Sequence, residues 1–361
     1  MKKTFLSELL VAERSQLSGN KLELNSGIYP VYGANGLVTY INFYEVDKPY
    51  LAVIKDGAGV GRVYKCPSKS SVLSTLQYLL PNSKIDLNYA YYWLSSLCLS
   101  KYAHGAAIPH IYYKDYKYES LLLPSLMVQK KIAERLDKVQ ELIAKQKEQI
   151  AKLDLLIKSR FLDMFGDPIS NPKKWRKEKI FDVIETNISK VKSKYTEDDT
   201  IKYVDISSID NITNTVRRFT TYLVKNAPSR AQQCLLKDDI LISTVRPNLR
   251  NIAINNRTDC NMVASSGFCV LRSNVCNPMW LFEIIKSNEF TSYLSNLTTG
   301  ANYPAVKDHD VYNYLFPCPP VILQNQFANF VKSVEQQKEV FSTRLSHFET
   351  LYKSLMQEYF G

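Results

Sequence analysis

The sequence has no apolar run long enough to cross a membrane, which takes about 20 residues. Glu8, Glu13 and Arg14 follow the opening Met-Lys-Lys at the place where a signal peptide has its apolar core. The 7 cysteines are an odd number and include no Cys-x-x-Cys pair, which favours reduced thiols over disulfides or a zinc site. We therefore expect a cytoplasmic protein that does not bind membranes.

Signatures of catalysis are also scarce. Gly57-Ala-Gly-Val-Gly61 follows an apolar run and resembles a nucleotide or S-adenosylmethionine loop, but a lone glycine pattern is weak evidence. The Pro319-Pro320 pair lacks the acid or amide and the aromatic residue of an amino-methyltransferase turn, and the 4 histidines are scattered. We expect no catalytic residue, no bound cofactor and no metal site in this chain.

Acidic residues are outnumbered. The chain has 46 Lys and Arg against 35 Asp and Glu, for a net charge of +11, and the excess lies mainly outside the long helical segments discussed below. Such a balance fits a polyanionic partner such as nucleic acid, although an ordinary basic protein would explain it equally well. With 361 residues, 45% of them hydrophobic, the chain is long enough for about two globular domains.

An internal repeat organises the chain. Residues 105–166 return without a gap as residues 300–361, with 13 identical positions among 62. The period is far above the roughly 20 to 50 residues of a solenoid repeat, so each copy belongs to a domain-sized unit. The rigid spacing is typical of a helix, whereas loops tolerate insertions.

Each copy of the repeat ends in a predicted long helix. The first begins after Pro124-Ser125, contains no proline or glycine, and stops at Gly166, a residue type that accepts the left-handed conformation found at helix ends. Apolar residues recur every 3.5 positions, the spacing of a coiled coil. A helix of roughly 60 Å is too long for a small domain to cover. We therefore expect the two helices to pair antiparallel, the alternative being burial of each helix in the core of its own domain.

The predicted coiled-coil interface has one polar residue in each helix. Matching Gln146 with Lys338 gives a register in which the numbers of facing residues sum to 484, with Ile143 opposite Phe341, and avoids burying a polar group against an apolar one. The predicted interface residues are Ile132, Leu136, Val139, Ile143, Gln146, Ile150, Leu153, Ile157, Phe327, Val331, Val334, Lys338, Phe341, Leu345, Phe348 and Tyr352.

The remaining segments predict two α+β domains. In the first, residues 28–32 and 37–41 read as strands around an Asn-Gly turn, residues 50–54 as a buried strand, and residues 88–102 as a helix. Residues 240–245 form the equivalent buried strand of the second. The predicted organisation is a first domain at 1–122, a helix within 123–168, a second domain at 169–317 and a helix within 318–361, related by a pseudo-twofold internal repeat.

Side chains of the types that read base edges and grip phosphates occur in both globular parts. For any one of them, a solvated surface position is the simpler explanation. The candidate DNA-binding residues are Tyr32, Asn35, Lys55, Arg62, Lys65, His110, Tyr112 and Lys114 in the first part, and Arg217, Arg218, Arg230, Arg246, Asn248, Arg250, Asn302 and Tyr303 in the second.

Five stretches carry a resemblance to a known family. They are Tyr29-Pro-Val-Tyr-Gly-Ala-Asn-Gly36, Gly105-Ala-Ala-Ile-Pro-His110, Leu123-Pro124 followed by Gln129-Lys-Lys-Ile-Ala133, Phe161-Leu-Asp-Met-Phe-Gly-Asp-Pro168, and Asp239-Ile-Leu-Ile-Ser243. In this order, and together with the duplicated helix, they resemble the specificity (S) subunit of type I restriction-modification systems over essentially the full chain.

The resemblance implies two target recognition domains, each reading one half of a bipartite double-stranded DNA target across a spacer set by the paired helices. It also implies two modification subunits, which use S-adenosylmethionine to methylate adenine, and restriction subunits that use ATP and Mg²⁺ and cleave DNA. This chain would bind none of those cofactors. A self-sufficient DNA methyltransferase and a coiled-coil adaptor that binds only protein remain as alternatives.

Overall fold

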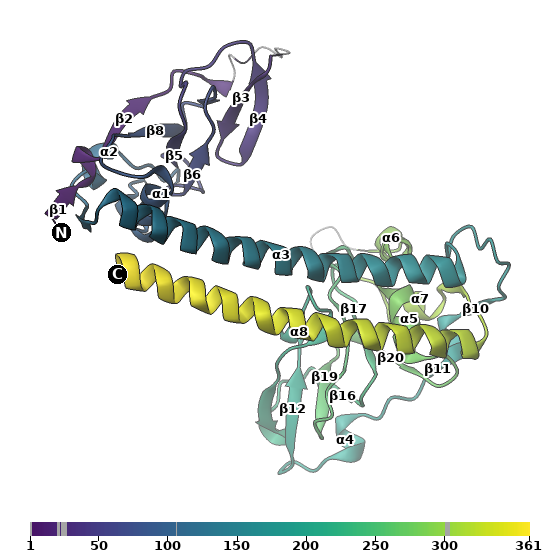
Figure 1. Cartoon of the computed structure of the whole chain (residues 1–361). Helices are drawn as coiled ribbons and strands as arrows, with labels where there is room; N and C mark the ends of the chain where they lie inside the picture. The colour runs from purple at the N-terminus through teal and green to yellow at the C-terminus, as the bar shows by residue number, and fades with distance from the viewer. Residues whose placement is uncertain (1, 20–21, 23–26, 106, 300–303) are drawn as a thin grey trace. The chain divides into compact units, whose positions relative to one another are not determined.

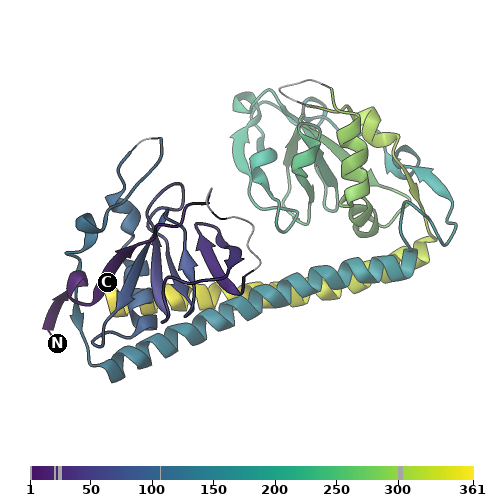
Figure 2. The ribbon, with the colours of Figure 1, turned by 90° about the horizontal axis from the view of Figure 1, so that it is seen from above.

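The computed structural model describes residues 2–19, 22, 27–105, 107–299 and 304–361, which divide into two units (Figures 1 and 2). Unit 1 comprises Met1–Gln149 and Phe341–Gly361, and unit 2 comprises Ile150–Val340. Each unit combines β-sheets and short helices with one segment from each of two long helices. Among the described residues, no helix is both long enough and apolar enough to span a bilayer.

In the described part of unit 1, the strands form three sheets, with strand orders β2-β8-β5-β6, β4-β3-β7 and β1-β9. Their bounds, with those of the two short helices, are β1 (Lys2–Phe5), β2 (Leu10–Arg14), β3 (Tyr29–Gly33), β4 (Gly36–Ile41), β5 (Tyr50–Ile54), β6 (Val63–Cys66), β7 (Ser71–Val72), β8 (Leu76–Pro81), β9 (Ser120–Leu123), α1 (Leu87–Ser96) and α2 (Tyr113–Tyr116).

Strand β5 is buried on both faces, which explains its unbroken run of apolar residues. Successive side chains of a strand point to opposite faces. Leu51 and Val53 therefore enter one apolar cluster with helix α1, whereas Tyr50, Ala52 and Ile54 enter another with β7 and β8. The strand predicted from residues 50–54 is confirmed. Because this strand is buried, it fixes the position of the residues that follow Ile54.

Unit 2 repeats this plan with additions. The strand orders are β11-β20-β17-β18-β14-β13, β15-β12-β19-β16 and β10-β21. The bounds are β10 (Lys177–Lys179), β11 (Ile184–Glu185), β12 (Thr200–Val204), β13 (Ile209–Asp210), β14 (Thr215–Val216), β15 (Thr220–Leu223), β16 (Ala231–Cys234), β17 (Ile240–Ser243), β18 (Ile252–Ile254), β19 (Met262–Ser265), β20 (Phe268–Ser273), β21 (Leu315–Pro317), α4 (Val191–Lys194), α5 (Pro278–Ile285), α6 (Asn288–Asn296) and α7 (Asp308–Tyr312).

The equivalence of the two units follows from strand pairing. In unit 1, β5 pairs antiparallel with β6 and with β8. In unit 2, β17 pairs antiparallel with β18 and with β20. Strand β17 is also buried on both faces, with Ile240 and Ile242 in one cluster and Leu241 in another. Mixed helix and sheet content makes the fold α+β, as predicted.

The two long helices have the bounds that the sequence indicated. Helix α3 spans Leu126–Phe165 and α8 spans Val321–Phe360. Gly166 follows α3 with a positive φ of 79°, and its N–H donates to the carbonyl of Leu162, so the glycine ends the helix in the expected way. The 16 predicted interface residues are all buried or half-buried.

Within each unit, the two helix segments run in opposite directions. In unit 1, Arg135 bonds the hydroxyl of Tyr359 at 2.8 Å, and Lys147, further along α3, pairs with Glu349, earlier along α8. In unit 2, the rings of Phe161 and Phe327 lie 5.5 Å apart. Residues of both helices also enter the apolar cores of the units, as the alternative of burial in a domain core requires.

The predicted register is wrong by about one heptad. Lys338 bonds Asp154 at 2.7 Å, so the numbers of this pair sum to 492 rather than 484. The ammonium of Lys338 also reaches Glu335 at 2.8 Å, which means that it needs no polar residue directly opposite. Gln146 is buried and bonds Gln149 of its own helix at 3.0 Å. Matching polar positions across the interface was therefore a poor guide.

The helix predicted at residues 88–102 is also wrong in part. Helix α1 starts after Asp86, whose carboxylate accepts the N–H groups of Asn88 and Tyr89, and it ends at Ser96. Cys98 then has a positive φ of 48°, which no α-helix contains, and a separate 3₁₀ turn covers Leu99–Tyr102. The apolar pattern continues through the break, which is why the sequence did not reveal it.

Candidate nucleic-acid interface

The end of strand β5 is joined to the segment that precedes α2. The N–H of Gly57 donates to the carbonyl of Pro109 at 2.9 Å, and the N–H of Ile111 donates to the carbonyl of Lys55 at 2.9 Å. Asp56 forms a β-bridge with His110 between these two bonds. This backbone arrangement, which we call the strand-end frame, holds residues 55–57 beside residues 109–111.

Unit 2 contains the same frame at the end of β17. The N–H of Arg246 donates to the carbonyl of Pro304 at 2.8 Å, the N–H of Val306 donates to the carbonyl of Thr244 at 2.9 Å, and Val245 bridges Ala305. Pairing position by position sets Lys55-Asp56-Gly57 against Thr244-Val245-Arg246. The two frames thus share their backbone and differ in every one of these three side chains.

The glycine-rich segment of unit 1 is explained by this frame. Gly57 and Gly61 have positive φ values of 90° and 85°, and the residues at the same places in unit 2, Arg246 and Arg250, have positive φ values of 51° and 54°. The tight turn requires left-handed backbone at both places. The glycines therefore serve the turn, because the arginine-containing copy has the same shape without them.

Three of the candidate residues of unit 1 meet at its frame. His110 bonds the carboxylate of Asp56, and its ring lies 4.1 Å from that of Tyr112. The ammonium of Lys114 lies 5.1 Å over the same tyrosine ring. The backbone of Lys55 belongs to the same frame through the bonds described above. Tyr112 and Lys114 are exposed, so an aromatic face and a positive charge are presented to solvent together.

The other candidates of unit 1 fall around this group or away from it. Tyr32 is half-buried in β3, Asn35 is exposed in the β3–β4 turn, and Arg62 is exposed at the end of the turn after β5. The carbonyl of Tyr32 accepts a hydrogen bond from the N–H of Leu73. The same segment bonds Lys55, whose N–H donates to the carbonyl of Thr75, so the end of β3 lies beside the segment that contacts the frame.

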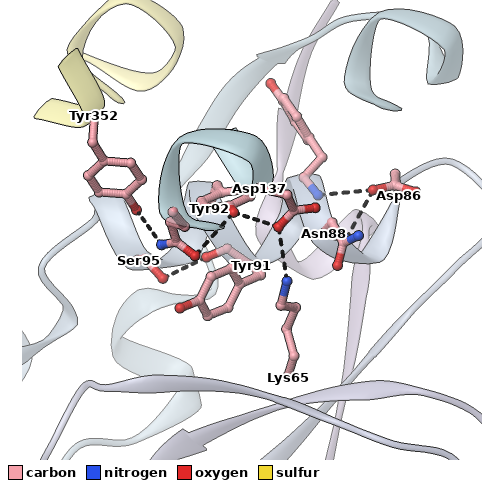
Figure 3. A network of polar contacts seen from close by, with 10 residues as sticks. Lys65, Asp86, Asn88, Tyr91, Tyr92, Ser95, Asp137 and Tyr352 are labelled. Carbon is pink, nitrogen blue, oxygen red and sulfur yellow. Dashed lines mark hydrogen bonds and ion pairs between the residues drawn. The ribbon is translucent and has the colours of Figure 1, made fainter. Parts of the chain in front are cut away.

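Lys65 faces the helices instead. Figure 3 shows its ammonium directed at Asp137 of α3, at 3.2 Å. The same ammonium lies 5.0 Å over the ring of Tyr91, and the hydroxyl of Tyr92 donates to the same carboxylate oxygen at 2.6 Å. Tyr92 is fully buried, and burial raises its pKa. The charge of Lys65 is therefore engaged in attaching β6 and α1 to α3.

In unit 2, Arg246 and Asn248 lie on the turn of the frame and are exposed. Arg230 lies near the frame. Its carbonyl accepts the N–H of Ser266 at 2.8 Å, and the carbonyl of the next residue, Gly267, accepts the N–H of Thr244. Arg250 is partly committed elsewhere. Its guanidinium bonds Asn288 at 2.7 Å and the carbonyl of Lys286 at the C-terminal end of α5.

Arg217 and Arg218 lie at the other end of the strands. They follow β14, which runs parallel to β18 with Thr215 beside Ile254. The same Ile254 pairs with the first residue of β17, whereas Arg246 follows the last residue of that strand. The structure does not bring these two arginines to the frame, because adjacent residue types in a sequence carry no information about which strand end they reach.

Two candidates, Asn302 and Tyr303, lie outside the described residues. Sequence reasoning also missed a cluster in unit 2, in which Lys202 and Arg257 bond Asp259 at 2.6 and 2.7 Å and both lie 4.9 Å over the ring of Phe219. No motif signals it. In the described part of the chain, the structure contains no group of three or more metal-ligating side chains.

Residues 1–154 match the family model described as type I restriction modification DNA specificity domain. The chain is 24% identical over 333 residues to the type I restriction enzyme MjaVIII specificity subunit of Methanocaldococcus jannaschii, covering 86% of this chain and 78% of that protein. It is 23% identical over 366 residues to the type I restriction enzyme EcoDI specificity subunit of Escherichia coli, covering 92% and 80%. The crystal structure of a type I restriction-modification system S subunit from M. genitalium superposes with a TM-score of 0.65 at 15% identity, covering 100% of this chain and 96% of that one, so the fold is shared.

Proposed function

We propose that the chain is the sequence-specific DNA recognition subunit of a type I restriction-modification complex, on the basis of its similarity to specificity subunits of such systems. Residues 1–122 and 169–317 are its two target recognition domains, each reading one half of a bipartite target. The helices within 123–168 and 318–361 pair antiparallel along their length, related by the pseudo-twofold repeat. At roughly 60 Å each, they separate the half-sites by about one to two turns of duplex.

The observation that carries this proposal is the strand-end frame, built twice on one backbone with different side chains. Lys55-Asp56-Gly57 occupies it in unit 1 and Thr244-Val245-Arg246 in unit 2. Two readers that share a scaffold and differ in their contact residues are what a target with two unlike half-sites requires. The exposed arginine and asparagine of unit 2 can bond guanine and adenine edges, and the aromatic and lysine pair of unit 1 can contact a groove and a phosphate.

The net charge of +11 supports the same assignment. Each cation that neutralises a phosphate releases a counterion, so affinity for duplex DNA falls steeply with salt. These contacts bind any sequence, and base-edge contacts from the two frames add the choice of sequence.

In this proposal the chain supplies recognition and no catalysis, and it acts in the cytoplasm. Two modification subunits bring S-adenosylmethionine and methylate adenine in the target, and restriction subunits bring ATP and Mg²⁺. The chain contributes to both reactions by placing the DNA.

Adenine methylation mapped across the genome of cells with and without this chain tests the proposal. A bipartite methylated motif present only with the chain is expected. Exchanging residues 169–317 for those of a relative should then change one half of the motif, and a simultaneous change in both halves would overturn the two-reader arrangement. Methyl transfer by the purified chain alone would show a self-sufficient methyltransferase, and salt-independent failure to bind duplex DNA would show an adaptor for protein.

A further inference from the structure

A buried glutamine in the first turn of α3 joins the segment that precedes α1 to the segment that precedes α3. Gln129 has no exposed surface. Its side-chain carbonyl accepts the N–H of Asp86 at 2.8 Å, and its amide nitrogen donates to the carbonyls of Lys84 and Pro124 at 3.1 and 2.9 Å. Asp86 caps the N-terminus of α1. The glutamine therefore ties the start of a domain helix to the start of the long helix.

The same device occurs in unit 2. Gln324 occupies the equivalent position in the repeat and is 1% exposed. Its carbonyl accepts the N–H of Asn277 at 2.9 Å, and its amide nitrogen donates to the carbonyl of Pro319 at 2.8 Å. Asn277 caps α5, as Asp86 caps α1. We call each glutamine, together with the cap and the proline that it bonds, a helix clamp.

Both glutamines bond backbone groups of the capping residue and of the proline, and this determines what the clamps do. An apolar side chain would fill the same space without fixing a direction, whereas an amide bonded to backbone N–H and C=O groups holds them at set angles. The helices that are held belong to the domain cores, because α1 contributes Trp93 and α5 contributes Trp280 to the large apolar clusters. Each clamp thus sets the orientation of a domain core on the first turn of a long helix.

We propose that Gln129 and Gln324 are positioning residues that set the spacer length of the DNA target. This inference rests on the proposed function. Neither glutamine reaches the surface, so neither contacts DNA. One base pair of spacer moves a half-site by about 3.4 Å and turns it by about 35°. A domain held at a fixed angle accepts one such placement, and a loosened domain accepts neighbouring ones while reading the same bases.

The test uses the chain assembled with its modification subunits and duplexes that carry the mapped target. Methylation rates are compared for the native spacer and for spacers one base pair shorter and longer. The intact complex is expected to favour the native spacer by about tenfold or more, since misplacement by a few ångströms costs at least that much in rate. With Gln324→Met the preference is expected to fall to about threefold or less, while the bases required in each half stay the same.

A matched control is available on the same helix. Gln337 is exposed on α8, so Gln337→Met makes the same chemical change without touching a clamp and should leave the spacer preference intact. If Gln324→Met fails to fold, Gln324→Glu replaces it, because a carboxylate keeps the bond from the N–H of Asn277 and loses the donation to Pro319.

Two cysteines beside the second clamp provide a rescue. The sulfur atoms of Cys276 and Cys318 lie 3.6 Å apart, and the amide nitrogen of Gln324 is within 3.8 Å of both. Glutathione disulfide can oxidise the pair: the two thiols lose two protons and two electrons to it, one bond forms between the sulfurs, and two glutathione thiols are released. The disulfide would connect the residue before Asn277 to the residue before Pro319, the two residues that Gln324 bonds. Oxidation of the Gln324→Met complex should therefore restore the spacer preference.

The outcomes separate the clamp from the function on which it rests. A wild-type complex without a bipartite target would overturn the proposed function. A wild-type complex with a strict spacer, together with a Gln324→Met complex that is equally strict, would overturn the clamp alone. The clamp would also be overturned by altered base preference in the variant, or by failure of the disulfide to restore the preference once mass spectrometry shows that it has formed.

Discussion

Replacing Asp239 with alanine should destabilise unit 2 more than any surface substitution. The carboxylate is 1% exposed and accepts two bonds from Arg272, at 2.9 and 2.8 Å, and one from the N–H of Leu236 at 2.7 Å. Asp239 immediately precedes β17, while Arg272 lies on β20. The alanine variant would leave a guanidinium that is only 15% exposed without its main partner.

The magnitude follows from removing one member of a buried pair. Burial raises the pKa of Asp239 although the bonds from Arg272 oppose the rise, so desolvation costs free energy that the pair only partly returns. Loss of one partner then costs about 3–5 kcal/mol, against a total of roughly 5–15 kcal/mol for a domain. The melting temperature of unit 2 should fall by roughly 6–20 °C.

The assay is urea unfolding followed by tryptophan fluorescence in a Trp93→Phe background. The two remaining tryptophans, Trp175 and Trp280, both belong to unit 2, so the signal reports that unit. The control replaces both partners, as Asp239→Leu with Arg272→Met, and should recover most of the lost stability because no charge is left unpaired. A loss below about 1 kcal/mol for the alanine variant, or a double variant no more stable than the single one, would refute the reasoning.

Two further predictions concern the helices. Cysteines at Ile143 and Phe348 should form a disulfide readily on mild oxidation, and cysteines at Ile143 and Phe341 should not, because the observed register differs from the predicted one by a heptad. Gel mobility without reductant distinguishes the two variants, and the reverse result would contradict the observed register. Tyr92→Phe should cost unit 1 about 1.5–3 kcal/mol in urea unfolding through loss of a bond to a charged group. Tyr118→Phe, at a position 66% exposed, should cost less than about 0.5 kcal/mol, and equal losses would count against the network of Figure 3.

The limits of the long helices were predictable because periodicity, proline and glycine act locally. A run without helix breakers between Pro124 and Gly166 leaves little choice of ends. The register was not predictable in the same way. It depends on where the flexible side chain of Lys338 finds carboxylates, and Asp154 and Glu335 lie beside the interface rather than in the heptad core.

The candidate interface was predictable only as a set of residue types. Lys65 and Arg250 have the chemistry of DNA-binding residues, yet the fold uses them for internal contacts with Asp137 and with the end of α5. Lys55 and Arg246 each lie in the strand-end frame of their own unit, because strand pairing brings distant segments together there. The type of a side chain indicates what it can bind, whereas the fold determines which groups lie within its reach.

The division of the chain has a consequence for its synthesis. Unit 1 needs Leu355 of α8 in its core, and that residue is translated more than 200 positions after Gln149. At about 5–20 residues per second, the ribosome translates Leu355 roughly 10–40 seconds after it translates Gln149. The domain made first is therefore completed last, and its nascent apolar face around Leu136 needs shielding until the final turns of α8 arrive.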